Sequence, residues 1–311
     1  MASTPDLKND VYDVAIVGGG PAGLTASLWL ARYLHSVVLI DSGDPRNWET
    51  RGINGFLGSQ GIRSPELRAR GRADAEQFGV ELVDDEVCKV RNTNGERFVL
   101  DLDKGRIIES RRLLLCIGIR DVWPDIPGLG DCYGETAHVC PDCDGYETRG
   151  RKTVVVGSGR KAVGMALNLT TWTDKIVICT NGEPPNMEAE HLEKLKALNI
   201  PVLEAEVRNI SSKDGEIRAL NLDGGMCLDC DRLYFAIGQY PADDLGAQLK
   251  CKRDEFSLIE IDEHYHTSVK NVFAAGDIVG GPQLAIAAAA DGAIAALSIH
   301  ASLVPESRKL D

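Results

Sequence analysis

Two cysteines separated by two residues are the part of this chain best suited to chemistry. They lie in the segment Cys140-Pro141-Asp142-Cys143-Asp144-Gly145. Thiols at this spacing can close a reversible disulfide and carry two electrons, although the same spacing also occurs in metal sites. A zinc module would need a second pair, and Cys227 and Cys230 follow more than eighty residues later, which is too far for a compact module. We therefore predict redox chemistry at Cys140 and Cys143, and no metal site.

The neighbours of these cysteines favour thiol chemistry. Pro141 suits the first position of a helix, so Cys140 would lie at a helix N-terminus, where the helix dipole stabilises a thiolate. The thiolate is the attacking species in disulfide exchange. Asp144 is a candidate for moving the proton that this chemistry requires. His138 is a further candidate that would tune the thiolate, although a lone histidine is more often a packing or surface residue.

The other cysteines and histidines give weaker indications of a functional role. Cys227 and Cys230 are predicted to be packing residues, since positions three apart on a strand face opposite sides of the sheet. His264 and His266 lack a third ligand for a metal. His300 lies on a predicted C-terminal helix, where it would be an exposed residue or reach the site of a second copy of the chain.

A glycine-rich turn near the N-terminus has the surroundings of a dinucleotide-binding unit. The apolar run Val11–Val17 predicts a buried strand, which leads into the turn Gly18–Gly23 and a helix over Leu24–Tyr33. A second strand, Ser36–Ile40, then delivers Asp41. Glycines let a backbone approach a pyrophosphate, the helix N-terminus attracts its charge, and the acid accepts hydrogen bonds from the adenosine ribose.

The same order of elements recurs in the middle of the chain. A strand over Lys152–Val156 precedes the turn Gly157–Ala162, a helix continues through Leu169, and a strand over Lys175–Thr180 follows. The sequence therefore predicts an α/β fold with two Rossmann-like nucleotide-binding domains. The later runs predict a meander over Val202–Asn209 and Glu216–Leu222, a strand before the turn at Gly276, and an alanine-rich helix over Leu284–Leu297 that we expect to be buried.

The second nucleotide-binding domain is expected to be inserted into the first. Two strands, at Leu113–Gly118 and Arg232–Gly238, each end in Ile-Gly and precede a proline-bearing linker. We therefore assign residues 1–120 and 244–311 to the outer domain. Residues 121–243, which carry both cysteines of the predicted redox pair, form the inserted domain.

These motifs resemble those of the low-molecular-weight thioredoxin reductases, over nearly the whole chain from Tyr12 to about Leu303. The resemblance implies a homodimeric flavoenzyme whose outer segments bind FAD and whose insert binds NADPH. It implies that Cys143 faces the flavin and that Cys140 exchanges with an external thiol or disulfide. Asp277 would hold the ribityl or pyrophosphate part of FAD, and Gln283 and Leu284 would lie near the flavin ring. The full set of residues expected to bind FAD is Gly18, Gly20, Pro21, Ala22, Gly23, Asp41, Ser42, Gly118, Gly276, Asp277, Gln283 and Leu284.

One departure from this family concerns NADPH. The NADPH-dependent members carry a basic His-Arg-Arg motif after the second strand of the insert, where this chain has Cys179-Thr180-Asn181-Gly182-Glu183-Pro184-Pro185. No cation lies there to pair with the extra phosphate, and Glu183 would repel it. Arg160 and Lys161 remain as candidate phosphate ligands or as exposed cations on a helix start. Three stretches look similar to the dithiol oxidases, which pass electrons to oxygen, and to flavin-linked enzymes that do not use NADPH. They are Asp41-Ser42-Gly43 with Arg46-Asn47, then Phe56-Leu57-Gly58, and Arg68 to Gly79.

Several functions therefore stay open. The leading hypothesis is an FAD-dependent thiol–disulfide oxidoreductase that does not use NADPH in the usual way, with oxygen, another flavin or a redox protein as its electron partner. The alternatives are an NAD(P)H-dependent thioredoxin reductase, a dithiol oxidase, and a flavin sensor without catalysis. Its partner would be a small dithiol or disulfide, or a thioredoxin-like protein. Asp144 matches the thioredoxin reductases, whereas dithiol oxidases often carry histidine at this position.

Composition narrows the setting. Acidic residues outnumber basic ones by 13, which disfavours binding to nucleic acid or to an anionic membrane surface. No uninterrupted apolar run reaches the length of a membrane span, because Asp291 breaks the alanine-rich stretch. Nine scattered cysteines do not resemble a secreted disulfide framework, and the polar N-terminus Met1–Asp10 lacks an apolar signal core. We therefore expect a cytoplasmic protein.

Overall fold

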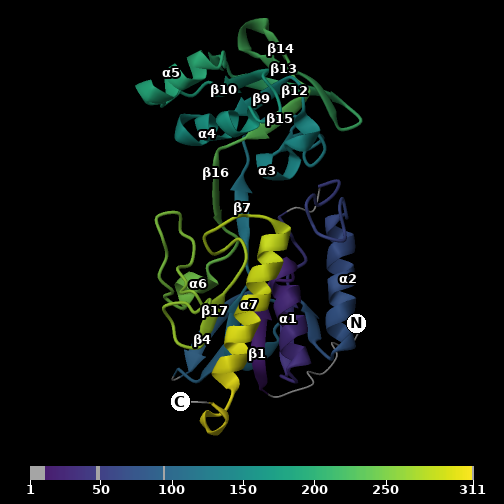
Figure 1. Ribbon diagram of the computed structural model, residues 1–311, viewed down its shortest axis with the longest axis vertical. Helices are drawn as coiled ribbons and strands as arrows, with labels where there is room; N and C mark the ends of the chain where they lie inside the picture. Colours follow the sequence, from purple (N-terminus) through teal and green to yellow (C-terminus); the bar gives the residue numbers. More distant parts are fainter. Residues whose placement is uncertain (1–10, 47–49, 94, 310–311) are drawn as a thin grey trace. The chain divides into compact units, whose positions relative to one another are not determined.

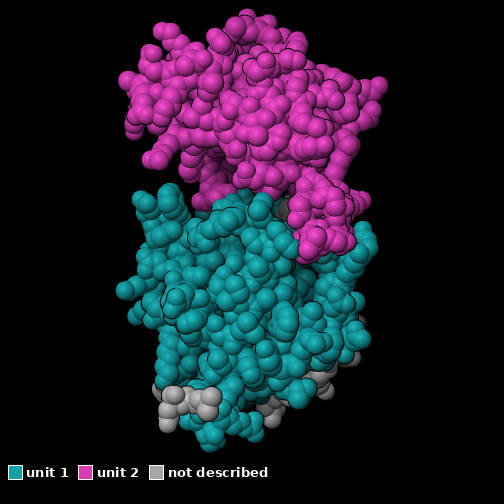
Figure 2. All heavy atoms as spheres, viewed as in Figure 1, with its two compact units in different colours: residues 1–48, 64–120, 240–311 teal, residues 49–63, 121–239 magenta. Residues whose placement is uncertain are grey.

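The computed structural model describes residues 11–46, 50–93 and 95–309, and these fall into two compact units. Of the described residues, unit 1 contains 11–46, 64–93, 95–120 and 240–309, and unit 2 contains 50–63 and 121–239 (Figure 2). The polar N-terminus and Asn47, both named in the sequence predictions, lie outside the described residues. Figure 1 labels many of the elements of each unit.

Unit 1 is built on a seven-stranded sheet. Six strands follow the order β3-β2-β1-β6-β5-β4. The seventh strand, β17, is outside this order and pairs with the C-terminal part of β6. Strands β1, β2, β3, β6 and β17 are parallel, whereas β4 and β5 form an antiparallel extension. The bounds are β1 Tyr12–Val17, β2 Val37–Asp41, β3 Glu81–Asp84, β4 Val87–Thr93, β5 Arg97–Leu102, β6 Ile107–Leu115 and β17 Val272–Ala274.

Two helices of unit 1 pack closely against each other beside this sheet (Figure 1). They are α1, Pro21–Arg32, and α7, Ala285–Leu303. A Cβ atom added to Gly292 of α7 would lie 2.1 Å from the carbonyl oxygen of Ala22, so only glycine permits this approach. The remaining helices of the unit are α2 Ser64–Gln77, α6 Leu245–Gln248 and the 3₁₀ turn Glu306–Arg308.

Helix α7 is buried on one face only, which corrects the expectation of a buried helix. Ala288, Gly292, Ala295, Ala296 and Ile299 face the core of unit 1. Ile286, Ile294 and Leu297 are between 39% and 48% exposed, and they form an apolar stripe on the outer face. By length and composition alone, this 19-residue helix is apolar enough to cross a membrane, yet its inner face packs on α1.

Unit 2 contains a five-stranded parallel sheet of order β11-β10-β9-β15-β8 and a three-stranded antiparallel sheet of order β12-β13-β14. Its strands are β8 Ala137–His138, β9 Thr153–Val156, β10 Ile176–Cys179, β11 Val202–Leu203, β12 Val207–Lys213, β13 Glu216–Leu222, β14 Cys227–Asp229 and β15 Arg232–Phe235. Its helices are α3 Pro141–Asp144, α4 Gly159–Leu169 and α5 Ala189–Ala197, with 3₁₀ turns at Tyr146–Thr148 and Asp223–Gly225. The predicted strand–turn–helix–strand order is present in both units, which confirms the α/β fold class.

The chain passes between the units through more segments than expected. Strands β7, Ile119–Val122, and β16, Gly238–Pro241, pair in a two-stranded sheet at two of these passages. Unit 2 begins its long segment at Asp121, the residue where the inserted domain was expected to begin, and ends it at Gln239 rather than at residue 243. Unit 2 also takes in residues 50–63, which the sequence predictions had assigned to the outer domain.

Candidate redox site

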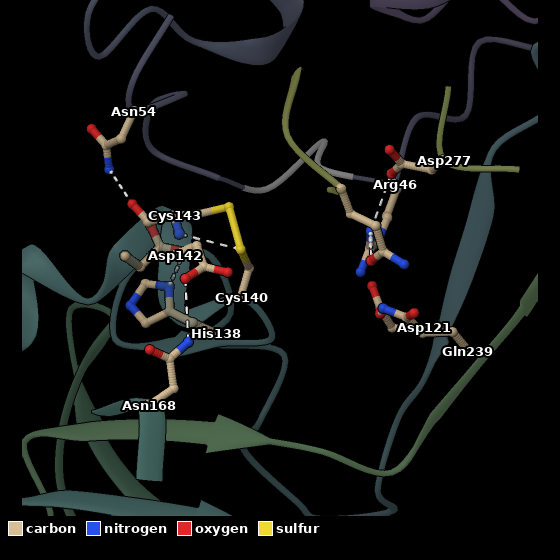
Figure 3. The surroundings of a disulfide bond; sticks show 12 residues. Arg46, Asn54, Asp121, His138, Cys140, Asp142, Cys143, Asn168, Gln239 and Asp277 are labelled. Carbon is tan, nitrogen blue, oxygen red and sulfur yellow. Dashed lines mark hydrogen bonds and ion pairs between the residues drawn. A yellow bond between two sulfur atoms is a disulfide. The ribbon is translucent and has the colours of Figure 1, made fainter. Parts of the chain in front are cut away.

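Cys140 and Cys143 form a disulfide at the start of α3 (Figure 3). Their Cα atoms are 5.4 Å apart. Cys140 is the N-cap of α3, Pro141 is the first helical residue, and the Cys143 N–H donates to the Cys140 sulfur at 3.2 Å. The predicted placement of Cys140 at a helix start is confirmed. Both sulfurs are thus held at the first turn of a helix, where a thiolate released by reduction would accept the same N–H.

Asp144, the residue that follows Cys143, forms a pair with His138. The Asp144 Oδ2 and His138 Nδ1 atoms are 3.4 Å apart, and the two side chains are 19% and 6% exposed. Burial, together with the nearby Glu147, raises the pKa of Asp144 to about 7. Burial, together with Arg232, lowers the pKa of His138 to about 3. Asp144 can therefore hold or release a proton near neutral pH, as the predicted acid–base role requires.

A loop from an earlier part of the sequence contacts the disulfide segment. Asn54 donates its side-chain amide to the Cys143 carbonyl oxygen at 3.0 Å (Figure 3). Gln60 in turn donates to the Asn54 side chain at 2.9 Å, and the Gly55 N–H donates back to Gln60 at 2.8 Å. Residues 50–63 therefore form a loop that is hydrogen-bonded to helix α3, and Leu57 in this loop is 90% exposed.

The glycine turn of unit 1 fits a pyrophosphate. Gly18 has φ +107°, and an added Cβ would lie 2.2 Å from the Cys116 carbonyl oxygen, so this turn requires glycine. At Gly20 an added Cβ would meet nothing within 4 Å, so space is open beside the turn. Gly20 caps α1 without a side-chain hydrogen bond, and Pro21 is the first helical residue. The helix N-terminus is therefore available to an anion.

Asp41 ends β2 beside this turn, as predicted, and is 7% exposed. Arg68 of α2 forms an ion pair with Asp41 and also donates to the Gly19 carbonyl oxygen at 3.3 Å. Arg72 lies 3.6 Å from the same carboxylate. The predicted ribose ligand is thus held by two arginines of the stretch Arg68–Gly79, and their contact with Asp41 was not predicted. Ser42, also expected at the cofactor, is exposed.

The C-terminal part of the expected FAD site is assembled around Arg46. Its guanidinium donates to Asp277 Oδ2 at 3.2 Å and to Gln283 Oε1 at 3.0 Å; Figure 3 shows Arg46 beside Asp277. Gly276, with φ +81°, lets this turn approach α1, because an added Cβ would lie 3.0 Å from that of Ala22. Leu284 caps α7. The residues present in unit 1 therefore fit FAD.

Gly23 and Gly118 are the remaining glycines predicted to bind FAD. An added Cβ on Gly23 would lie 1.9 Å from the Gly18 carbonyl oxygen, which packs α1 against the glycine turn. Gly118 follows β6 with φ +67° and accepts the Ala242 N–H at 3.2 Å. The structure thus brings Gly18, Gly20, Pro21, Ala22 and Gly23 together at one turn with Asp41, and it groups Asp277 with Gln283.

The second glycine turn, in unit 2, is covered by its own chain. The Gly159 N–H, which corresponds to that of Gly20 in unit 1, donates to the Pro185 carbonyl oxygen at 2.8 Å. An added Cβ on Gly159 would also lie 3.4 Å from the Asn186 carbonyl oxygen. The segment after β10 is held in this position by Thr180, whose hydroxyl donates to the Glu183 carbonyl at 2.5 Å. Protein carbonyls therefore occupy the place beside this turn where a pyrophosphate would bind.

Other predicted residues have structural surroundings. Cys230 is buried in the core of unit 2, as predicted, whereas Cys227 is exposed, so its predicted packing role is wrong. His300 is not a free surface residue: its ring stacks on Tyr33 at 3.9 Å, and its Nδ1 bonds to His35 Nε2 at 3.0 Å. Within the described residues, no group of three or more His, Cys, Asp or Glu residues could hold a metal.

Both units have the strand–glycine turn–helix arrangement of a dinucleotide-binding domain. The residues of unit 1 fit FAD, and unit 2 carries a disulfide, so the protein is a flavin-dependent disulfide oxidoreductase. The chain belongs to the pyridine nucleotide-disulphide oxidoreductase family, whose profile matches residues 12–292. It is similar to thioredoxin reductase from Bacillus subtilis (strain 168), with 26% identity over 94% of this chain and 95% of that one. It is also similar to a ferredoxin–NADP reductase from Ignicoccus hospitalis, with 30% identity over 91% of this chain and 95% of that one.

Solved structures confirm the thioredoxin reductase-like fold. The crystal structure of a putative thioredoxin reductase TrxB from Bacillus anthracis matches with a TM-score of 0.87 and 26% identity, over 94% of this chain and 98% of that chain. The crystal structure of HlmI matches with a TM-score of 0.90 and 31% identity, over 96% of this chain and 95% of that chain. These relatives are named for different electron partners, since one is a thioredoxin reductase and another a ferredoxin–NADP reductase. Membership of the family therefore establishes the class of enzyme but not its electron partner.

Proposed function

We propose that this enzyme exchanges electrons between FAD and a small dithiol or a thioredoxin-like protein through Cys140 and Cys143, without taking them from NADPH in the usual way. The observation that carries the proposal is the hydrogen bond from the Gly159 N–H to the Pro185 carbonyl oxygen. A nicotinamide dinucleotide needs that N–H and the space beside it for its pyrophosphate. Binding would therefore require the segment that contains Pro185 to move away first.

The charges near the covered turn support the same conclusion. The segment Asn181–Pro185 contains Glu183 and no cation, so a 2′-phosphate would find repulsion where NADPH-dependent enzymes supply arginines. Arg160 and Lys161, at the start of α4, are both exposed. They offer a surface charge beside a turn that is already covered, and this does not replace the missing motif.

The thiol chemistry can be followed atom by atom. A substrate thiolate attacks the Cys140 sulfur, the S–S bond breaks, and Cys143 leaves as a thiolate. Asp144, whose pKa is raised to about 7 by burial, supplies the proton that the departing sulfur takes up. The second substrate thiol then passes its proton to Asp144 and attacks the substrate sulfur of the mixed disulfide, which releases Cys140 as a thiolate. The substrate loses two electrons and two protons; the cysteine pair gains both electrons and, through Asp144, one proton, and the proton of the first substrate thiol goes to solvent.

Bound FAD would supply the two-electron acceptor or donor for this cysteine pair. Gly18, Gly20 and Asp41 would hold its adenosine and pyrophosphate parts, with Arg46 and Asp277 at the other end. We propose oxygen, another flavin or a redox protein as the far electron partner. The oxidase direction follows if the substrate is a dithiol, because its electrons then need an outlet other than NADP⁺.

An anaerobic titration of the purified, flavin-loaded protein tests this function. NADPH, NADH, dithiothreitol and reduced ferredoxin are added in separate runs while the flavin absorbance is followed, and oxygen is then admitted. We expect dithiothreitol to bleach the flavin and oxygen to restore it. Rapid stoichiometric bleaching by NADPH or NADH would show that the enzyme is an ordinary nicotinamide-dependent reductase.

The cysteine assignment has its own control. Cys143→Ser should retain bound flavin and lose all bleaching by dithiol, whereas Cys227→Ser, at an exposed cysteine in the same unit, should behave like the unmodified protein. If Cys143→Ser turns over normally, Cys143 does not carry the electrons. A colourless protein that cannot be reconstituted with FAD would refute both the proposed relay and the alternative of a flavin sensor.

We also propose that the enzyme is a cytoplasmic homodimer. The apolar stripe of Ile286, Ile294 and Leu297 on α7 supports dimerisation, because an exposed apolar helix face is stabilised by a second copy. Seven of the nine cysteines are free, which suits a reducing compartment. Light scattering of the unmodified protein and of Leu297→Glu tests the first point: a monomer in both cases would contradict it.

A further inference from the structure

The ring of His138 is buried, and among the described residues only one of its two nitrogens has a polar partner. His138 lies in β8, which pairs with β15 at Tyr234, and the two rings are 5.4 Å apart. Its Nδ1 faces Asp144 Oδ2 at 3.4 Å. Its Nε2 is buried and has no hydrogen-bond partner within the described residues. The two nitrogens of one ring therefore have opposite surroundings.

This asymmetry selects a tautomer. If the ring proton were on Nε2, a buried N–H would have no acceptor, which costs free energy that a bare lone pair largely avoids. The proton is therefore favoured on Nδ1, where it can be donated to Asp144. A neutral ring in this state stabilises the ionised carboxylate, because a hydrogen bond to the charged form favours that form.

The groups around the pair do not replace this donor. Arg232 acts on His138 and disfavours a positive ring, and Glu147 acts on Asp144 and disfavours a negative carboxylate. The Tyr234 hydroxyl is engaged with the Thr148 hydroxyl at 2.8 Å. Burial lowers the pKa of His138 to about 3, so the ring stays neutral at working pH. It therefore acts on Asp144 by donating its Nδ1–H and not by a positive charge. The carboxylate thus depends on His138 to offset its burial.

We propose that His138 is a positioning residue for the disulfide chemistry: its Nδ1–H holds the Asp144 carboxylate, and its orphaned Nε2 keeps the proton on the side that faces Asp144. This rests on the proposed function, in which Asp144 is the acid and base next to Cys143. His138 touches neither substrate nor sulfur and acts through Asp144. Losing the donor makes Asp144 harder to ionise, so the pH range over which it can act as an acid moves upward.

The test measures how fast dithiothreitol opens the Cys140–Cys143 disulfide in the full-length protein between pH 5 and 9, with the freed thiols trapped by a maleimide. The rate needs an ionised thiol of the reagent and a protonated Asp144. The rate is therefore divided by the ionised fraction of the reagent thiol at each pH, and this normalised rate falls at high pH as Asp144 becomes ionised. In His138→Leu, which keeps the volume without a donor, this fall should move upward by about one pH unit. In His138→Asn, whose amide can occupy the Nδ1 position, it should stay in place.

A double-variant comparison separates positioning from packing. Asp144→Asn should remove the fall at high pH, and adding His138→Leu to it should change nothing further. If His138→Leu has the same effect in both backgrounds, or if it folds and leaves the pH profile unchanged, the proposal is wrong. His191→Leu is the matched control, because its buried Nδ1 also lacks a partner and lies in the same unit; it should leave the profile unchanged.

Two further measurements keep the outcome clear. Should His138→Leu fail to fold, His138→Gln moves the amide toward the Nε2 position and should show the same upward shift. Infrared titration of the protonated Asp144 carboxyl, assigned with Asp144→Asn, reads its ionisation directly and should shift in the same direction. Neither reading requires electrons to reach the flavin. Failure of dithiol to bleach the flavin would therefore reject the proposed function, while an unshifted carboxyl titration would reject this inference.

Discussion

The Asn54 amide donates to the backbone carbonyl oxygen of Cys143 at 3.0 Å, so a loop that follows β2 in the sequence is fastened to a cysteine of the disulfide. Gln60 and Gly55 complete the network that holds this amide in place. The loop therefore depends on a short chain of neutral hydrogen bonds, with an exposed apolar tip at Leu57.

Replacing Asn54 with Ala should release this loop. A neutral hydrogen bond of this kind contributes about 1 kcal/mol, so the open state should become about fivefold more populated. Limited proteolysis with chymotrypsin, which cuts after Phe56 or Leu57, measures this population. Asn92→Ala, which removes a side chain that accepts the Gly95 N–H in unit 1, should leave the cleavage rate unchanged. Equal cleavage of Asn54→Ala and the unmodified protein would show that the contact does not restrain the loop.

Gly292→Val should destabilise unit 1 and weaken FAD retention. The added Cβ would lie 2.1 Å from the Ala22 carbonyl oxygen, so α1 and α7 must separate, and we expect a loss of about 3 kcal/mol or more. Gly164→Ala is the matched control, because an added Cβ on this helical glycine meets nothing within 4 Å. That change should stabilise the protein by about 0.5–1 kcal/mol. Urea unfolding of both variants checks the contrast in sign.

Arg46→Ala should reduce FAD affinity by about tenfold, which corresponds to about 1.4 kcal/mol. Arg46 holds Asp277 and Gln283 at the C-terminal part of the site, and both side chains lose that partner in the variant. Flavin released during diafiltration measures the effect. Arg120→Ala removes the partner of the more exposed Asp44 and should retain flavin normally. Normal retention in Arg46→Ala would remove Arg46 from the cofactor site.

The pair His35 and His300 should make unit 1 less stable in mild acid. Burial lowers the pKa of His35 below its usual 6.5, with Asp13 opposing and His300 adding to the shift. The unfolded chain then binds a proton below about pH 6.5 that the folded protein resists, so stability falls as the pH drops from 7 toward 5. His300→Phe keeps the stack on Tyr33 and removes the ring nitrogen beside His35.

Thermal unfolding at several pH values measures this dependence. The midpoint should fall less steeply with decreasing pH in His300→Phe than in the unmodified protein. Contributions from His138 and Asp144 are common to both proteins and cancel in the comparison. If the midpoint depends on pH in the same way in both proteins, His300 does not affect the protonation of His35.

The sequence was sufficient where structure is local. The apolar runs and glycine turns predicted β1, α1 and β2, and again β9, α4 and β10, because periodicity and left-handed glycines act over a few residues. The start of α3 at Pro141 followed from proline's fixed φ and missing N–H. Strands β3 and β4 and helix α2 were not predicted, since their segments are largely polar and carry no strong pattern. Strand β5 was also not predicted, although its alternating buried residues Phe98, Leu100 and Leu102 have the period of a strand.

The contacts that complete the site are between distant positions. Arg68 reaches Asp41, Arg46 reaches Asp277, and Asn54 reaches Cys143, each across many residues of sequence. Arg46 belongs to a motif that the sequence shows, but the sequence does not indicate its partner Asp277, which lies more than two hundred residues later. The Pro185 carbonyl over Gly159 likewise has no sequence signal, because a backbone oxygen belongs to every residue.

The membership of residues 50–63 in unit 2 bears on how such proteins could exchange parts during evolution. The chain has four passages between the units rather than two, so unit 2 cannot be transplanted as one uninterrupted stretch of gene. A graft of residues 121–239 alone would bring the cysteine pair into a new host without Asn54. The host would have to supply its own loop at the Cys143 carbonyl, which ties the inheritance of the loop to that of the disulfide.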